Sequence, residues 1–266
     1  MSRTNSTSTT VKATLLLAST LTVMSGATIS PALPAIQAHF TGTENAALLV
    51  RLVLTMPALF MVLTAPLAGG VADRAECKPL LVGSTVLYAI AGGSGFVLDS
   101  LLAIIVGRAA LGVAVGGITV GATALITDYY LGEQRDSVLG LQGSFTQFGG
   151  VLFLPLGGVL ADVGWRMPLL IYLTSLLLLP TMLLSLYESE GTATDSTSDA
   201  PMDLDSLRST IEELPWRSLA PVYAIALFVM IVFYMIPVQI PFYLENLTGA
   251  TATLIGIAPW HADRNY

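Results

Sequence analysis

Long apolar runs separated by short polar turns dominate the chain. A helix needs about 20 apolar residues to cross the ~30 Å hydrocarbon core of a bilayer. Seven segments reach that length: Thr14–Ile36, Ala46–Ala72, Pro79–Leu98, Leu101–Ile126, Val138–Ala161, Pro168–Leu186 and Leu219–Tyr243. Because the links between the first six are short, neighbouring helices should run antiparallel. The pattern therefore predicts an all-α integral membrane protein.

Composition agrees with this prediction. Of the 266 residues 54% are hydrophobic and 11% are charged, whereas a soluble domain carries about 25% charged residues. The net charge of -7 comes largely from the acidic stretch between Glu188 and Arg217, which argues against nucleic acid as a partner. A single cysteine, Cys77, excludes an internal disulfide and a multi-cysteine metal site. We therefore expect neither a metal nor another cofactor.

Polar segments divide the chain into parts. We expect a central loop on the cytoplasmic side, and an amphipathic helix within it, since Leu204, Leu207, Ile211 and Leu214 share one helical face. After helix seven, Ala252–Ala258 begins an eighth span that the last residues end, so the eighth helix is expected to be truncated. The expected parts are a cytoplasmic tail 1–13, a six-helix bundle 14–187, the loop 188–218, the start of a second bundle 219–258 and an atypical tail 259–266.

Lysine and arginine in the loops set the orientation of a membrane protein, because they concentrate on the cytoplasmic side. With the N-terminus in the cytoplasm, only Arg51 and Arg166 fall outside. The others near the spans fall inside: Arg3, Lys12, Arg74, Lys78, Arg135, Arg208 and Arg217. We expect a plasma-membrane protein with a cytoplasmic N-terminus.

Several motifs occur in order along the spans. The turn after the second span reads Gly69-x-x-x-Asp73-Arg74-x-x-x-Lys78, and the fourth span contains Arg108-x-x-x-Gly112. An acidic-to-arginine turn from Asp128 to Arg135 follows, and then a glycine-rich fifth span from Gly149 to Arg166. Together these motifs resemble the signature elements of the major facilitator superfamily of secondary transporters. The first motif departs from the family pattern at Glu76 and Cys77, and Leu154-Pro155 stands where the family has Gly-Pro.

The resemblance implies a fold and a mechanism. Family members have two six-helix bundles, each a 3+3 inverted repeat, that rock about a site at the bilayer midplane. This chain would contain the first bundle, a seventh helix and a truncated eighth. A faint repeat fits such a duplication, because Thr41-Gly42 and Thr248-Gly249 follow Pro34 and Pro241 at the same spacing.

Arg108 is the strongest candidate for a site residue. A guanidinium facing lipid costs roughly 2.5–3.5 kcal/mol at a helix centre, so we expect it to face the bundle interior. It could contact an anionic substrate or tune a proton site. Alternatively, it could be a hydrogen-bond hub for backbone carbonyls, or reach out to the surface.

The other candidates are polar residues at the span ends and within the spans. The first motif and Arg135, a possible partner of Asp73, would form a gate latch, or they could simply keep a charged turn in the cytoplasm. Asp128 could couple transport to a proton, or be a solvated helix-end acid. The uncharged candidates could bind substrate or bridge helices: Gln142, Gln147 and Gln239.

Two hypotheses for the function follow. The first is a permease of the major facilitator type, efflux-like, that moves a small organic solute across the bilayer by alternating access, with a proton as the candidate coupling ion. The alternative is a non-transporting membrane protein, either an inert truncation product or a half-transporter subunit that needs a partner for the missing second bundle. An enzyme is not expected, because no span carries a Ser, His and Asp constellation or an acidic metal cluster.

Overall fold

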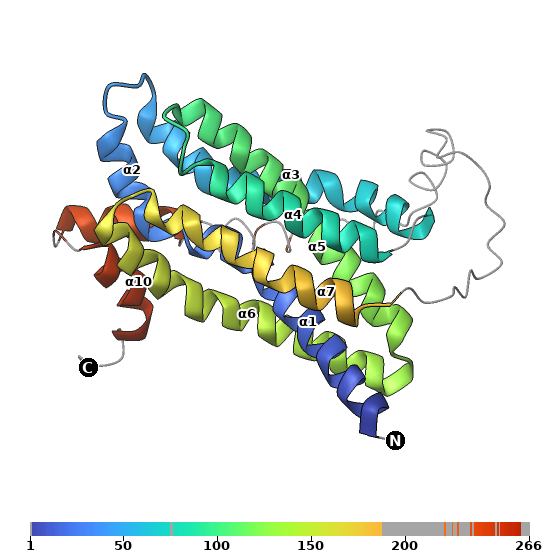
Figure 1. Ribbon diagram of the computed structural model, residues 1–266. Coiled ribbons are helices and arrows are strands. Elements are labelled where there is room, and N and C mark those ends of the chain that lie inside the picture. The colour runs from blue at the N-terminus through green and yellow to red at the C-terminus, as the bar shows by residue number, and fades with distance from the viewer. Residues whose placement is uncertain are drawn as a thin grey trace. The chain divides into compact units, whose positions relative to one another are not determined.

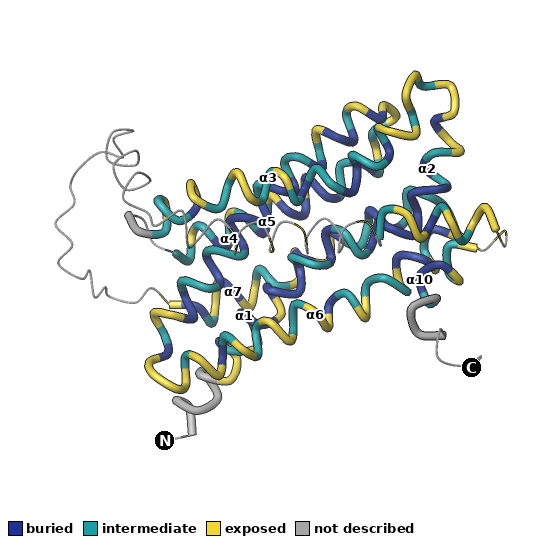
Figure 2. Tube along the Cα trace, turned by 180° about the vertical axis from the view of Figure 1, so that it is seen from behind, coloured by how far each residue is buried: buried dark blue, intermediate teal, exposed yellow. Residues whose placement is uncertain are grey.

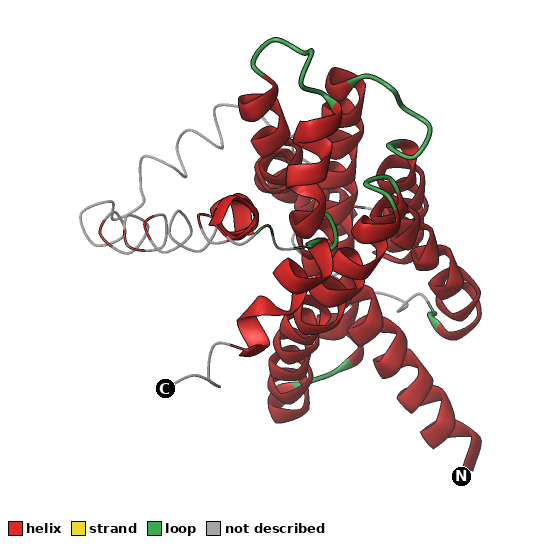
Figure 3. Cartoon of the chain, turned by 90° about the vertical axis from the view of Figure 1, so that its left-hand side faces the viewer, coloured by secondary structure: helices red, strands yellow, loops and turns green. Residues whose placement is uncertain are grey.

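The computed structural model describes residues 2–74, 77–187, 221, 225, 228, 235, 237–247, 249 and 251–261. These residues contain helices and turns but no strand (Figure 3). The predicted central loop, its amphipathic helix and most of the predicted seventh span lie outside the described residues. Met1–Glu188 and Val238–Tyr266 form one compact unit.

From Ser2 to Ser185 the helices follow one another with short turns between them (Figure 1). They are α1 (Ser2–Ala27), η1 (Ser30–Ala32), α2 (Leu33–His39), α3 (Ala46–Arg74), α4 (Cys77–Ser94), α5 (Leu101–Tyr129), α6 (Gly132–Val163), η2 (Met167–Leu178), α7 (Leu179–Ser185) and α10 (Ala252–His261). The symbol η marks helices of the 3₁₀ type.

Each of the first six predicted spans corresponds to a helical segment. Five segments of the described chain are long and apolar enough to cross a membrane: Thr9–His39, Ala46–Ala72, Leu101–Tyr129, Gly132–Val163 and Met167–Ser185. The predicted third span, Pro79–Leu98, corresponds to α4, an 18-residue helix with Lys78 and Pro79 in its first turn that is not among these five. Helix α6 begins at Gly132, earlier than the expected Val138. The polar residues that precede the apolar run are part of the helix. Glu133 in its first turn favours that start through the helix dipole.

Two spans are discontinuous, which the apolar pattern does not predict. In the first span α1 ends at Ala27, and the chain continues through η1 into α2. Pro31 has no N–H for the carbonyl group of Ala27, so the α-helical hydrogen bonding cannot pass this point. In the sixth span η2 precedes α7.

Helix α1 has a central place in the bundle and packs against α5, α6, η2 and α7. Helices α3 and α4 pack on α5, and α4 also packs on η2 (Figure 1). Glycine allows close approach between helices: a Cβ on Gly112 of α5 would lie 2.8 Å from the Cα of Pro57 in α3. The two backbones are therefore in direct contact, as the glycine content of the spans suggests.

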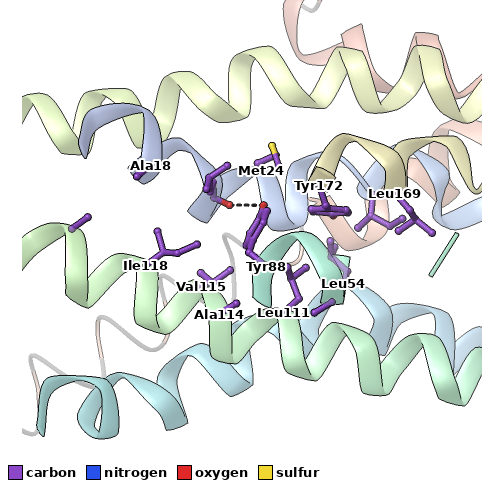
Figure 4. Close-up of a cluster of buried hydrophobic side chains, with 14 of the residues drawn as sticks. Ala18, Met24, Leu54, Tyr88, Leu111, Ala114, Val115, Ile118, Leu169 and Tyr172 are labelled. Carbon is purple, nitrogen blue, oxygen red and sulfur yellow. Dashed lines mark hydrogen bonds between the residues drawn. The ribbon is translucent and has the colours of Figure 1, made fainter. Parts of the chain in front are cut away.

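Large apolar side chains lie both inside and outside the bundle. Leu15, Met24, Leu111 and Ile118 are among the fully buried ones, and some of this core appears in Figure 4. Outward-facing stretches of α3 and α6 are exposed (Figure 2). They carry Leu59, Val62, Leu63 and Leu67 on α3, and Phe148, Leu152, Leu156 and Val159 on α6. Such apolar outer faces suit contact with lipid and with other helices.

Candidate functional site

Arg108 lies at the centre of a hydrogen-bond network inside the bundle. Its side chain is only 1% exposed, although it carries a charge. Nε donates to the carbonyl oxygen of Val53 at 3.0 Å, and Nη1 donates to the hydroxyl oxygen of Tyr172 at 2.8 Å. Nη2 donates to the carbonyl oxygen of Ser25. One side chain on α5 thus holds α1, α3 and η2.

The two carbonyl groups that Arg108 binds are the ones that helical geometry leaves without partners. In an α-helix the carbonyl group of Val53 would accept from the N–H of residue 57, which is Pro57 and has none. Ser25 lies in the last turn of α1, where carbonyl groups have no intrahelical donor. An unpaired buried carbonyl costs free energy. Arg108 therefore satisfies acceptors at a helix break and at a proline.

Two tyrosines complete the network. The hydroxyl group of Tyr172 donates to the carbonyl oxygen of Ser25 at 2.9 Å, and its ring centroid lies 5.3 Å from the Arg108 guanidinium carbon. Tyr88 donates to the carbonyl oxygen of Leu21 at 2.8 Å (Figure 4). The two rings meet edge to face, with centroids 5.6 Å apart. The buried charge of Arg108 thus lies against two carbonyl oxygens, one hydroxyl group and one aromatic ring.

This geometry bears on the functional and the structural interpretations of Arg108. The buried guanidinium binds backbone carbonyls, as a structural hub would. In this conformation the surrounding helices close it to a solute. A role in substrate binding therefore requires movement of those helices, and it stays a prediction.

A second polar layer joins α1, α5 and α6. Nε2 of Gln142 lies 3.0 Å from Oγ of Ser19 and 3.2 Å from Oγ1 of Thr123. Thr22 and Thr119 are hydrogen-bonded at 3.3 Å. Most of these groups are half-buried and all are uncharged. Gln142 thus bridges helices here, whereas Gln147 and Gln239 are exposed.

The predicted gating motif lies at the end of α3 and the start of α4. Asp73 and Arg74 close α3, and their side chains lie outside the described residues. Nζ of Lys78 donates to the carbonyl oxygen of Leu183 in α7 at 3.2 Å. Leu183 lies in the last turn of α7, where the helix dipole favours the positive charge of Lys78. A Cβ on Gly69 would meet nothing within 4 Å.

Two further candidates lie near that end of the bundle. Nε of Arg135 lies 3.7 Å from Oδ1 of its neighbour Asp136, and both side chains are exposed. The pairing of Arg135 with Asp73 stays a prediction. Asp128 is exposed near the end of α5. Beside it Tyr129 stacks on Tyr187 with ring centroids 4.5 Å apart.

Three residues form hydrogen bonds that no pattern in the sequence predicts: Tyr88, Tyr172 and Asp162. A tyrosine within an apolar span is a signal, because its buried hydroxyl group needs a partner. Asp162 is an acid just before the end of α6, and it accepts hydrogen bonds from the backbone of α10. Among the described residues no group of three or more His, Cys, Asp or Glu side chains could hold a metal ion.

Several apolar helices packed around a buried arginine that donates three hydrogen bonds define a multi-pass helical membrane protein. The sequence model of the Major Facilitator Superfamily matches residues 15–261. The chain belongs to this superfamily, as its motifs predicted.

Known relatives and structures agree with this assignment. The MFS-type efflux pump MMF1 of Pseudozyma antarctica (strain T-34) is 27% identical over 156 residues, which are 59% of this chain and 28% of the pump. A bacterial homologue of the human lysosomal transporter Spinster, inward-facing and occupied, is similar with a TM-score of 0.74 at 20% identity. That similarity covers 93% of this chain and 56% of the homologue. A D-xylose-proton symporter has a TM-score of 0.70 at 15% identity, covering 93% of this chain and 64% of the symporter.

These comparisons confirm the predicted family and the all-helical fold class. They also point to a transporter rather than an enzyme, since the matched proteins are transporters. The chain spans 28% of the length of the matched efflux pump and 57% of that of the unoccupied Spinster homologue.

Proposed function

We propose that this chain forms the first bundle of a permease that moves a small organic solute across the plasma membrane by alternating access. The observation that carries the proposal is the family match over residues 15–261. The similarity of this chain to an efflux pump supports transport of the solute out of the cell. The distribution of lysine and arginine supports a cytoplasmic N-terminus.

The proposed coupling ion is a proton. One structural neighbour is a D-xylose-proton symporter, and Asp128 is an exposed acid near the end of α5. A carboxylate that water can reach is able to exchange protons as the protein changes conformation. Asp128 is therefore our candidate for the coupling group.

The solute is proposed to contact the polar layer formed around Gln142. Its amide and the neighbouring hydroxyl groups can exchange their hydrogen bonds with a solute, and none of them carries a charge. Gln147 and Gln239 are further candidates because their side chains are exposed. Arg108 would act on this layer through the helices it holds.

The gate is proposed to lie at the turn between α3 and α4. Gly69, Asp73, Arg74, Lys78 and Arg135 would hold this end closed and release it as the bundles rock. Alternating access needs a second bundle opposite the first. We therefore propose that transport requires a second six-helix bundle in addition to the residues described here.

Transport assays in liposomes test these proposals. The purified 266-residue chain is reconstituted alone and together with the C-terminal half of the matched efflux pump, and the fluxes of radiolabelled D-xylose and of ethidium are measured. We expect no flux above that of protein-free liposomes from the monomeric chain, and flux of at least one probe when the second half is present.

The remaining outcomes decide between the alternatives. Robust flux from the monomeric chain would show that the second bundle is not required. If the complex assembles and neither probe moves, the non-transporting alternative is favoured. Asp73→Asn in the active complex should slow the flux without weakening retention of the probe by the protein, and an equal loss of both would contradict a gating role.

A further inference from the structure

Asp162, near the end of α6, binds the beginning of α10. Its Oδ1 accepts a hydrogen bond from the backbone N–H of Ala252 at 2.7 Å. Its Oδ2 accepts from the backbone N–H of Thr253 at 3.0 Å. Both carboxylate oxygens are thus used by the first two residues of a helix that lies 90 positions later in the chain.

The first N–H groups of a helix have no intrahelical acceptors, and side chains or water must satisfy them. The local capping residue of α10 is Thr251, whose carbonyl group accepts the first helical bond, from Ile255 at 3.0 Å. Its hydroxyl oxygen lies 3.4 Å from the N–H of Leu254. Thr251 does not accept a hydrogen bond from the N–H groups of Ala252 and Thr253. The carboxylate of Asp162 accepts from both. A negative charge at this position is also favoured by the helix dipole.

The cap lies next to a close helix contact. A Cβ on Gly256 of α10 would lie 2.8 Å from the carbonyl oxygen of Leu154 and 3.2 Å from the Cα of Pro155 in α6. Gly158 of α6 likewise leaves no room for a Cβ against the carbonyl oxygen of Ala252. The backbones of α6 and α10 therefore touch, and Asp162 binds the end of that contact.

The neighbouring charges do not compete for this carboxylate. Arg166, one helical turn further along the chain, pairs with Asp99 and lies over the ring of Trp165 at 4.7 Å. Asp162 itself is exposed. When α10 moves away, water can hydrate both the carboxylate and the freed N–H groups, so that separation leaves no buried unpaired group. A bond of this kind can form and break repeatedly.

We propose that Asp162 is a positioning residue of the transport cycle, which docks α10 on α6 through a charged helix cap and releases it when the two halves separate. The inference rests on the proposed function, because α10 lies where the eighth helix, a part of the second bundle, is expected. This contact is distinct from the proposed gate at the α3–α4 turn, because it involves other residues and joins α6 to α10.

Thiol labelling tests the proposal without a solute. In a Cys77→Ser background, Ile255→Cys places a reporter on α10 at a position that is 5% exposed. A second reporter, Leu111→Cys, replaces a core residue of α5 that is 0% exposed. The protein is placed in lipid nanodiscs, and the rate of reaction with a water-soluble maleimide is measured for each reporter.

Asp162→Ala is expected to raise the labelling rate at position 255 about three- to tenfold, the range that the loss of a helix cap implies. Labelling at position 111 should not change. Asp162→Glu keeps the charge and should restore most of the protection. Asp99→Ala is the matched control, because it removes an exposed acid that pairs with Arg166 and not with α10.

Two results would overturn the proposal. Unchanged labelling at position 255 would show that the cap does not dock α10. Faster labelling at both positions would show general unfolding instead of release of one helix. Because neither reading depends on flux, a protein that transports neither D-xylose nor ethidium can still pass or fail this test.

Discussion

Replacing Arg108 with alanine is expected to lower the free energy of unfolding of the bundle by about 2–5 kcal/mol. The variant loses three hydrogen bonds between helices, each worth roughly 0.6–1.7 kcal/mol in a membrane protein, and leaves a cavity in the core. The carbonyl group of Val53 is left unpaired, because Pro57 cannot donate to it. Unfolding of the purified protein in mixed micelles, followed by circular dichroism, measures the loss.

Two variants separate the network from the charge alone. Arg108→Lys keeps the charge but not the planar fork, so it should recover only part of the stability. Arg135→Ala removes an exposed arginine whose partner is its own neighbour Asp136, and it should change stability by less than about 0.5 kcal/mol. If Arg108→Ala were as mild as Arg135→Ala, the network would contribute little to the fold.

A double-mutant cycle with Pro57 tests the reason for the Arg108 contact. In Pro57→Ala the new N–H can satisfy the carbonyl group of Val53, so Arg108→Ala should cost less in this background. We expect a coupling free energy of about 0.5–1.5 kcal/mol, the range of one hydrogen bond. A coupling near zero would mean that the bond from Nε of Arg108 does not compensate for the proline.

The second large loss of stability is expected when Gly112 is replaced with alanine. A Cβ there would lie 2.8 Å from both the Cα of Pro57 and the Cβ of Phe60, and it would strike the carbonyl oxygen of Pro57. Gly112→Ala should therefore force α3 and α5 apart and destabilise the bundle by about 1–3 kcal/mol. The same unfolding measurement applies.

Gly143 in α6 provides a matched control, because a Cβ there would meet nothing within 4 Å. Gly143→Ala should stabilise the protein by about 0.5–1 kcal/mol, since alanine favours a helix more than glycine does. The two glycine substitutions should thus have opposite signs. The same sign and size at both positions would contradict a close contact between α3 and α5.

The spans could be predicted from the sequence, but the partners of their polar residues could not. Apolar runs and short turns locate helices well, because a bilayer admits few other structures. The partners of Arg108 come from positions 25, 53 and 172, and their meeting depends on how four helix segments pack. Pro57 does indicate a free carbonyl on Val53, yet nothing local indicates which donor reaches it.

The breaks within the spans and the contact of Asp162 with α10 also could not be predicted in full from the sequence. Pro31 suggests a break in the first span, but the 3₁₀ form of η2 has no comparable signal in its apolar sequence. Asp162 looks like an ordinary helix-end acid until α10 is placed beside it. Charges at the gate can be located from the motif, whereas their pairing depends on side-chain positions that no sequence pattern specifies.

The break after Ala27 and the proline at position 57 have a consequence for biogenesis. As the chain enters the membrane in order, the carbonyl groups of Ser25 and Val53 arrive before either of their side-chain donors. Arg108 reaches them with the fourth span, and the hydroxyl group of Tyr172 follows with the sixth. The first two spans therefore cannot reach their final hydrogen bonding as an inserted hairpin, and their maturation waits for later spans.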